Sequence, residues 1–215
     1  MRAPSAERAG RSVKKGSVQL KYLKILYTMY PAIGLLSEYR LAKQIVNKYG
    51  CRRILDIGCG RGNLLRVLEK GGAEVDLYVG VDINLFPFPS TWRGQFVVCD
   101  VRRLPVATSR FDCVVFVNSI FYISLGVLKD MEPPRRVFVV IDIDPKYPHI
   151  RLVDLLESGL RGMRLTKKRL LEWLTKNGFT VVEHGGNATY YIVFSRTVQA
   201  DGSPADEGLT AGKPS

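Results

Sequence analysis

The 215-residue sequence contains no run of roughly 18 apolar residues, so it offers no candidate for a membrane-spanning helix. Its basic start, residues 1–15, is not followed by the apolar segment that a secretory signal requires. We therefore expect a protein that has no membrane partner and is located in the cytoplasm.

Cysteine is scarce. The chain has four, Cys51, Cys59, Cys99 and Cys113, and no two of them form the closely spaced pair typical of zinc sites or thioredoxin-like redox sites. We expect no metal site, and we expect all four to be small buried apolar residues.

Acidic residues are outnumbered by basic ones, 20 to 32, which gives a formal net charge of +12. Residues 1–16 contribute +4 and residues 197–215 contribute −2, so +10 remains on the middle of the chain. A positive field favours an anionic partner such as RNA, or a phosphorylated or carboxylate small molecule. A charge-rich surface that binds no such partner is the alternative.

The two ends of the chain are poor in aromatic and branched residues. Residues 1–16 and 197–215 are rich in Gly, Ser, Pro, Ala and charge, so we predict disordered tails there. With 46% hydrophobic residues, the rest can bury one sizeable core. We predict a single domain over residues 17–196, with leading helices over 17–50 and the core over 51–196.

Strand and helix patterns alternate along that core. Short apolar segments over residues 53–58, 77–83, 95–101, 111–119 and 135–143 are typical of buried strands. A helix over 166–176 and two strands joined by "GGN" follow them. Such alternation predicts an α/β fold: a doubly wound, Rossmann-like seven-stranded sheet, mostly parallel, with an antiparallel C-terminal hairpin strand.

Polar residues gather where the predicted strands end. Asp56 and the glycine turn of residues 58–62 follow the first strand, and Asp82, Asp100 and Asn118 end the next three. Ligands of doubly wound sheets bind beyond the carboxyl ends of the strands. A glycine turn alone would fit a tight connection, but the acids and the amide at successive strand ends indicate a ligand site.

The glycine spacing separates two kinds of cofactor. The dinucleotide fingerprint requires G-x-G-x-x-G, whereas "GCGRG" has G-x-G-x-G and Asn63 stands where the third glycine would be. Asp56 would repel a pyrophosphate but attract an ammonium group. The turn therefore favours an amine-bearing cofactor over NAD and disfavours a nicotinamide oxidoreductase.

These segments resemble the class I S-adenosylmethionine-dependent methyltransferases. "ILDIGCGRG", "YVGVDIN", "CDVRRLP" and "FDCVVFVNSIFYI" are similar to the family's first four motifs, and the resemblance extends over residues 36–196. It implies S-adenosyl-L-methionine as cofactor and a closing antiparallel strand. It also implies that Asp56 and the turn of residues Gly58, Cys59, Gly60, Arg61 and Gly62 hold the methionine end of the cofactor, and that Asp82 holds the ribose hydroxyls. Asp100 and Val101 would lie near the adenine, and Asn118 would line the pocket near the sulfonium. Ile83 is also expected to bind the cofactor.

Catalytic residues are less well marked, because an activated sulfonium methyl mainly needs alignment with its acceptor. The Asn/Asp-Pro-Pro-aromatic motif of amino-group methylation is absent after Asn118, and no Pro-Cys nucleophile occurs. Weak candidates for catalysis are Tyr122, Asp144 and His149, although packing or a surface loop would explain each of them. We expect only one of Asp142 and Asp144 to face the pocket.

Substrate contacts are predicted for Tyr30 and for the basic segment 145–169, in particular Arg161 and Arg164. A solvated helix face would explain that segment equally well. The leading hypothesis is methyl transfer to a small or medium anionic or phenolic metabolite. Methylation of tRNA or rRNA is the alternative, and a non-catalytic cofactor-binding protein is a further one. Nothing in the sequence indicates the acceptor atom or the oligomeric state.

Overall fold

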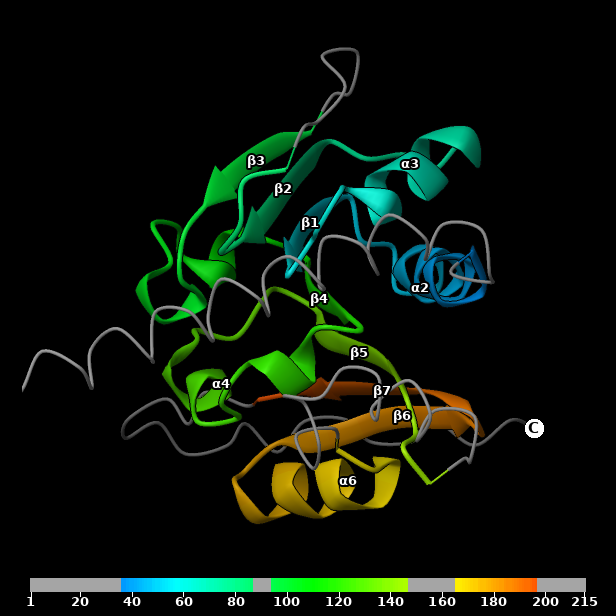
Figure 1. Cartoon of the computed structure of the whole chain (residues 1–215), viewed down its shortest axis with the longest axis vertical. Coiled ribbons are helices and arrows are strands. Elements are labelled where there is room, and N and C mark those ends of the chain that lie inside the picture. Colours follow the sequence, from blue (N-terminus) through cyan, green and yellow to red (C-terminus); the bar gives the residue numbers. More distant parts are fainter. Residues whose placement is uncertain (1–35, 87–93, 147–164, 197–215) are drawn as a thin grey trace, which may run out of the picture.

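The computed structural model describes residues 36–86, 94–146 and 165–196. Within these ranges seven strands form one sheet in the order β3-β2-β1-β4-β5-β7-β6 (Figure 1). The strands are β1 (Arg53–Ile57), β2 (Leu77–Asp82), β3 (Gln95–Val98), β4 (Cys113–Val117), β5 (Val137–Ile143), β6 (Thr180–Gly186) and β7 (Thr189–Ser195). The α-helices are α2 (Leu36–Lys48), α3 (Asn63–Lys70), α4 (Val127–Asp130) and α6 (Lys167–Lys176), and the short 3-10 helices are η2 (Val101–Arg103), η3 (Thr108–Arg110) and η4 (Ile120–Tyr122).

The sheet has the mixed topology that the sequence predicted. β1 pairs in parallel with β2 and β4, β2 with β3, and β4 with β5. β7 is antiparallel to both β5 and β6. Because the chain moves outward from β1 to β3 and then returns to place β4 on the other side of β1, the sheet is doubly wound with its switch point between β1 and β4.

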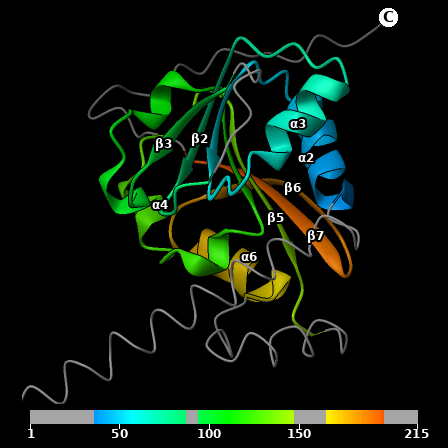
Figure 2. The ribbon, with the colours of Figure 1, turned by 45° about the horizontal axis from the view of Figure 1, so that its top comes forward.

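Helices cover both faces of the sheet, and strand alternation decides which residues meet them (Figure 2). Ile54 of β1 packs in a core cluster with residues of α2 and α3. Its neighbour Leu55 packs in the opposite cluster with residues of α4 and α6. Successive side chains of a strand point to opposite faces, so each buried strand contributes to two cores.

The first helix that the structure describes, α2, lies within residues 17–50, where leading helices were predicted. The tails of residues 1–16 and 197–215 and the earlier predicted helix lie outside the described residues. Of the helices that the structure describes, none is both long and apolar enough to span a membrane.

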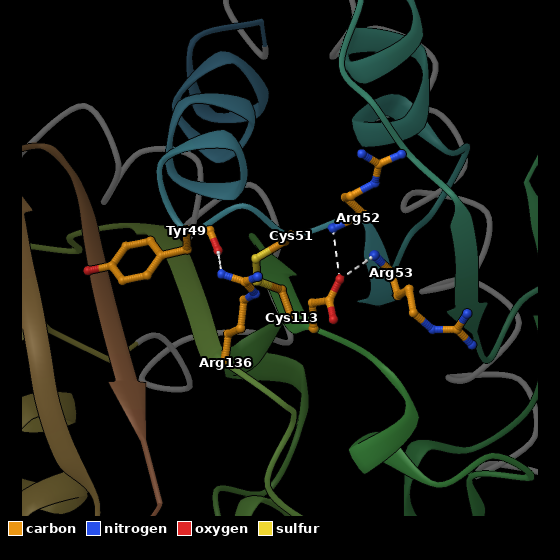
Figure 3. Close-up of a disulfide and its surroundings, with 7 residues drawn as sticks. Tyr49, Cys51, Arg52, Arg53, Cys113 and Arg136 are labelled. Atoms are coloured by element: carbon orange, nitrogen blue, oxygen red, sulfur yellow. Dashed lines mark hydrogen bonds between the residues drawn. A yellow bond between two sulfur atoms is a disulfide. The ribbon is translucent and has the colours of Figure 1, made fainter.

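The cysteines depart from the prediction that all four are merely small apolar residues. Cys51 and Cys113 form a disulfide that links the connection between α2 and β1 to the start of β4 (Figure 3). The two residues are 62 positions apart, but β4 lies beside β1 and pairs Cys113 with Ile54. Cys59 is buried and free, and Cys99 is half-buried and free.

Polar contacts surround this disulfide. The Asp112 carboxylate accepts hydrogen bonds from the backbone N–H groups of Arg52 and Arg53, at 2.9 Å each. The Arg136 guanidinium donates to the Tyr49 carbonyl at 3.0 Å (Figure 3). These contacts hold the amino-terminal edge of the parallel strands together, opposite the edge where the ligand site is predicted.

Candidate active site

The chain leaves β1 through the turn of residues 58–62, in which three glycines have positive φ angles. The φ angles of Gly58, Gly60 and Gly62 are 73°, 53° and 71°. Residues with a Cβ rarely adopt this conformation, which explains the repeated glycine. The N–H groups of Gly58 and Cys59 donate to the Val81 carbonyl at 2.7 and 3.1 Å. The turn is thus fastened to β2 before the chain enters α3.

Gly58 meets a second constraint, which a substitution can test. A Cβ at Gly58 would lie 2.4 Å from the Ser119 Cβ, whereas Gly72, with a φ of 63°, has no such neighbour within 4 Å. We expect Gly58→Ala to lower the free energy of unfolding by about 1–3 kcal/mol more than Gly72→Ala. Denaturant titration of both variants measures the difference, and equal losses would contradict the close contact.

Asp82, at the end of β2, braces the glycine turn. One of its carboxylate oxygens accepts from the Gly60 N–H at 2.9 Å, and the other accepts from the Asn84 N–H at 2.9 Å. Asp82 is half-buried and lines the large cavity described below. The carboxylate that the motif assigns to the ribose is therefore oriented by the turn and by the residues that follow β2.

Asp56 lies behind the turn and is only 2% exposed. The Tyr78 hydroxyl of β2 donates to its carboxyl at 2.5 Å. Burial raises the pKa of Asp56 to about 7, although the Tyr78 hydrogen bond acts in the opposite direction. Asp56 is not among the residues that line the cavity, so the structure places it beneath the turn and not on the cavity surface.

A cavity of about 990 Å³ opens beside the turn, at the carboxyl ends of β1, β2 and β4. Of the residues that sequence reasoning assigned to a ligand or to catalysis, Gly58, Asp82, Ile83, Asp100, Val101 and Tyr122 line it. Sequence reasoning missed several others, among them Asn84, Leu85, Phe86, Cys99, Arg102, Ser119, Ile123 and Val127. Most of these stand within a few residues of a strand end, which is the signal that would have found them.

Asp100 is held by its neighbour Arg102. The carboxylate accepts from the Arg102 N–H at 3.0 Å and from the guanidinium Nε at 3.0 Å. These bonds hold the pKa of Asp100 down to about 2. Asp100 therefore stays ionised at neutral pH and caps η2 at the rim of the cavity.

Asn118 has the positive φ angle of 52°, which is uncommon for a residue other than glycine. Its backbone N–H donates to the Ile141 carbonyl at 2.8 Å. Both polar atoms of its side chain are buried without a hydrogen-bond partner, and so is the Nε atom of Arg61 in the turn. Buried polar groups are normally paired, so these three atoms mark places where a ligand or water would complete the bonding.

The catalytic candidates are not brought together. Tyr122 lines the cavity with 39% of its surface exposed. Asp144 does not line the cavity. Its carboxylate accepts hydrogen bonds from the Lys146 N–H at 3.1 Å and from the Lys167 N–H, at the start of α6, at 3.4 Å. His149, Tyr30, Arg161 and Arg164 lie outside the described residues.

The expectation that one of Asp142 and Asp144 faces the pocket is wrong for the large cavity. Both are 2% exposed, and neither lines it. Residues two positions apart in an extended strand share a face, so strand alternation gave no reason to expect Asp142 and Asp144 on opposite sides. Asp144 contributes to the junction between β5 and α6.

Within the described residues, no group of three or more His, Cys, Asp or Glu side chains is arranged to hold a metal ion. The cavity wall instead combines the carboxylates of Asp82 and Asp100 and the guanidinium of Arg102 with uncharged polar and apolar side chains. This chemistry suits an organic ligand with hydroxyl groups and a flat apolar part.

Comparisons with known proteins bear on the family and the fold. Residues 54–132 match the family described as a methyltransferase domain. No curated protein matches the sequence. The plantazolicin methyltransferase BpumL, solved in complex with SAH, is 12% identical with a TM-score of 0.65, over 86% of this chain and 99% of that one.

Two further solved structures are similar. The methyltransferase domain of bacterial CtHen1 is 19% identical with a TM-score of 0.58, over 75% of this chain and 100% of that one. The protein PH0226 from Pyrococcus horikoshii OT3 is 22% identical with a TM-score of 0.52, over 73% and 88%. At such identities the likeness concerns the fold. Residues 54–132 thus match a methyltransferase-domain family, and the whole sheet has the fold of the methyltransferases, as the sequence motifs predicted.

Proposed function

We propose that this chain moves the sulfonium methyl group of S-adenosylmethionine to a small or medium anionic or phenolic acceptor. One observation carries the proposal: the glycine turn, Asp82 and Asp100 meet at one cavity at the carboxyl ends of the parallel strands. S-adenosylmethionine supplies an activated methyl group, so the protein has to bind and align the two reactants.

Each part of such a cofactor has a suitable group in the chain. Asp82 is placed to accept bonds from ribose hydroxyls, and Ile83 and Val101 offer apolar surface for the adenine. The turn, with its positive φ angles, lets the backbone approach the methionine end closely, and the start of α3 favours the carboxylate. The buried, unpartnered amide of Asn118 fits a polar group near the reacting centre.

The nature of the acceptor is inferred from the cavity wall and from the charge. Leu85, Phe86, Tyr122, Ile123 and Val127 give the wall an apolar and aromatic character, which favours a flat acceptor. The overall charge of +12 favours an anionic one, whereas Arg102 at the rim is already paired with Asp100. The same charge supports RNA as the second candidate acceptor.

The direct test is incubation with labelled S-adenosylmethionine and separate metabolite, RNA and protein fractions. We expect label in the metabolite fraction. Label in RNA, together with binding to bulk RNA that weakens steeply with salt, would favour the second candidate. Cofactor binding without transfer to any fraction would indicate a non-catalytic binding protein.

The assignment of Asp82 has its own test. Asp82→Ala removes the predicted ribose acceptor and the brace at Gly60, so we expect the affinity for S-adenosylhomocysteine to fall about 10- to 100-fold, as for the loss of a charged hydrogen-bond partner. Asp76→Ala, just before the start of the same strand, serves as the control and should leave the affinity unchanged. Calorimetry compares the two, and an unchanged affinity in Asp82→Ala would contradict the assignment.

A further inference from the structure

The pair formed by Tyr78 and Asp56 is the most deeply buried polar contact near the site. Each residue is 2% exposed, and the hydroxyl lies 2.5 Å from the carboxyl oxygen. Strand register explains how they meet: Tyr78 stands opposite Ile54, and Gly80 stands opposite Asp56. A Cβ at Gly80 would lie 2.8 Å from both the Cys59 sulfur and a Phe96 ring carbon, so the glycine leaves room for the turn to pack behind the pair.

In the part of the chain that the structure describes, no ion pair compensates the charge of Asp56. The titratable groups that act on the pair are Cys59 of the turn, Asp82 at the end of β2 and Tyr39 of α2. On β4 the register partner of Asp56 is Val115, which is apolar and fully buried. Among the described residues no cation pairs with Asp56, so Tyr78 is the group that stabilises its charged form.

We propose that Tyr78 is a positioning residue for cofactor binding: its hydroxyl holds the Asp56 carboxyl group beneath the glycine turn and favours the charged form, which attracts the cofactor ammonium. This inference rests on the proposed function, since it concerns the same cofactor. Tyr78 does not line the cavity. It would act on the cofactor through Asp56, whose charge lies beneath the glycine turn.

The physical basis is the balance of two effects on one carboxyl group. Burial favours the neutral acid and raises the pKa of Asp56 to about 7, while the Tyr78 hydrogen bond favours the carboxylate. Removing the hydroxyl leaves burial unopposed. The carboxyl group would then stay protonated to a higher pH, and the ammonium would lose its counter-charge at neutral pH.

The test is the pH dependence of S-adenosylhomocysteine binding to wild type and to Tyr78→Phe. At each pH we divide the dissociation constant of the variant by that of wild type. The ligand titrates in the same way in both measurements, so its own pH dependence cancels in this ratio. We expect the pH below which affinity declines to rise by about one to two units in the variant. The ratio should therefore be about tenfold or more at pH 7 and fall toward one above pH 9.

Tyr190→Phe is the matched control. Tyr190 is fully buried, and its hydroxyl donates to the Leu165 carbonyl at 3.0 Å, away from the turn. It should cost stability without moving the pH profile. An analogue of the ligand that lacks the α-amino group gives a second control, because its affinity should not respond to Tyr78→Phe.

Wild type alone provides a measurement if Tyr78→Phe does not fold. Calorimetry near pH 7 in buffers of different ionisation enthalpy should show proton release on binding, because the ammonium favours ionised Asp56. No release in wild type, or the same pH profile in wild type and Tyr78→Phe, would overturn the inference. Absence of binding at every pH would instead overturn the proposed function.

Discussion

Asp56→Asn is expected to make the protein more stable at pH 8 while weakening cofactor binding. The wild-type carboxyl has to ionise in a fully buried place, and burial raises its pKa from 3.8 to about 7. The neutral amide of Asn still accepts the Tyr78 hydrogen bond but never ionises. The variant therefore avoids the free-energy cost of a buried carboxylate, which lowers the stability of wild type at alkaline pH.

The sign of the pH dependence follows from the raised pKa. The folded state binds the proton more tightly than the unfolded state, so wild-type stability is full below about pH 4 and declines as the pH rises to 7. A shift of about three units corresponds to at most about 4 kcal/mol. The advantage of the variant should therefore be largest above pH 7 and vanish toward pH 4.

Denaturant titrations between pH 4 and pH 8 measure this difference. Asp76→Asn is a control of opposite sign, because the hydrogen bond from Arg52 lowers the pKa of the exposed Asp76. Its replacement should lower stability about equally throughout this range, because the pKa of Asp76 is lowered from 3.8 and Asp76 therefore stays ionised between pH 4 and pH 8. If Asp56→Asn is no more stable than wild type at pH 8, ionisation of the buried Asp56 does not destabilise the fold.

Reduction of the Cys51–Cys113 disulfide is expected to have a similarly large effect in the opposite direction. The bond closes a loop over 62 positions, and a cross-link over such a loop stabilises a fold by about 4 kcal/mol in the chain-entropy account. For a domain of this size that amounts to a fall in Tm of roughly 10 °C. Thermal unfolding with and without a reductant tests it.

Two controls support that measurement. The double variant Cys51→Ala with Cys113→Ala should lose its response to the reductant, whereas Cys99→Ala should retain it. Unfolded, unreduced protein should show two titratable thiols, from Cys59 and Cys99, and four would mean that the disulfide is absent. Cofactor affinity should survive reduction, because the bond lies at the edge of the sheet opposite the cavity.

Much of the fold could be predicted because its signals are local. Short apolar segments predicted strands β1 to β5 in the observed places, and the "GGN" stretch lies where β6 turns into β7. The glycine turn of residues 58–62 was likewise recognisable from residue type alone. Asp82 and Asp100 reached the cavity because parallel strands end on one edge of a sheet.

By itself, then, the sequence determined the element types, the doubly wound topology and the edge that carries the site, since these depend on periodicity and on residues adjacent in the chain. Only the tertiary structure decided which distant groups meet. It joined Cys51 to Cys113, placed Tyr78 against Asp56 and assigned Asp144 to the start of α6. Such contacts depend on which strands become neighbours and in which register, and no local pattern of residues records that.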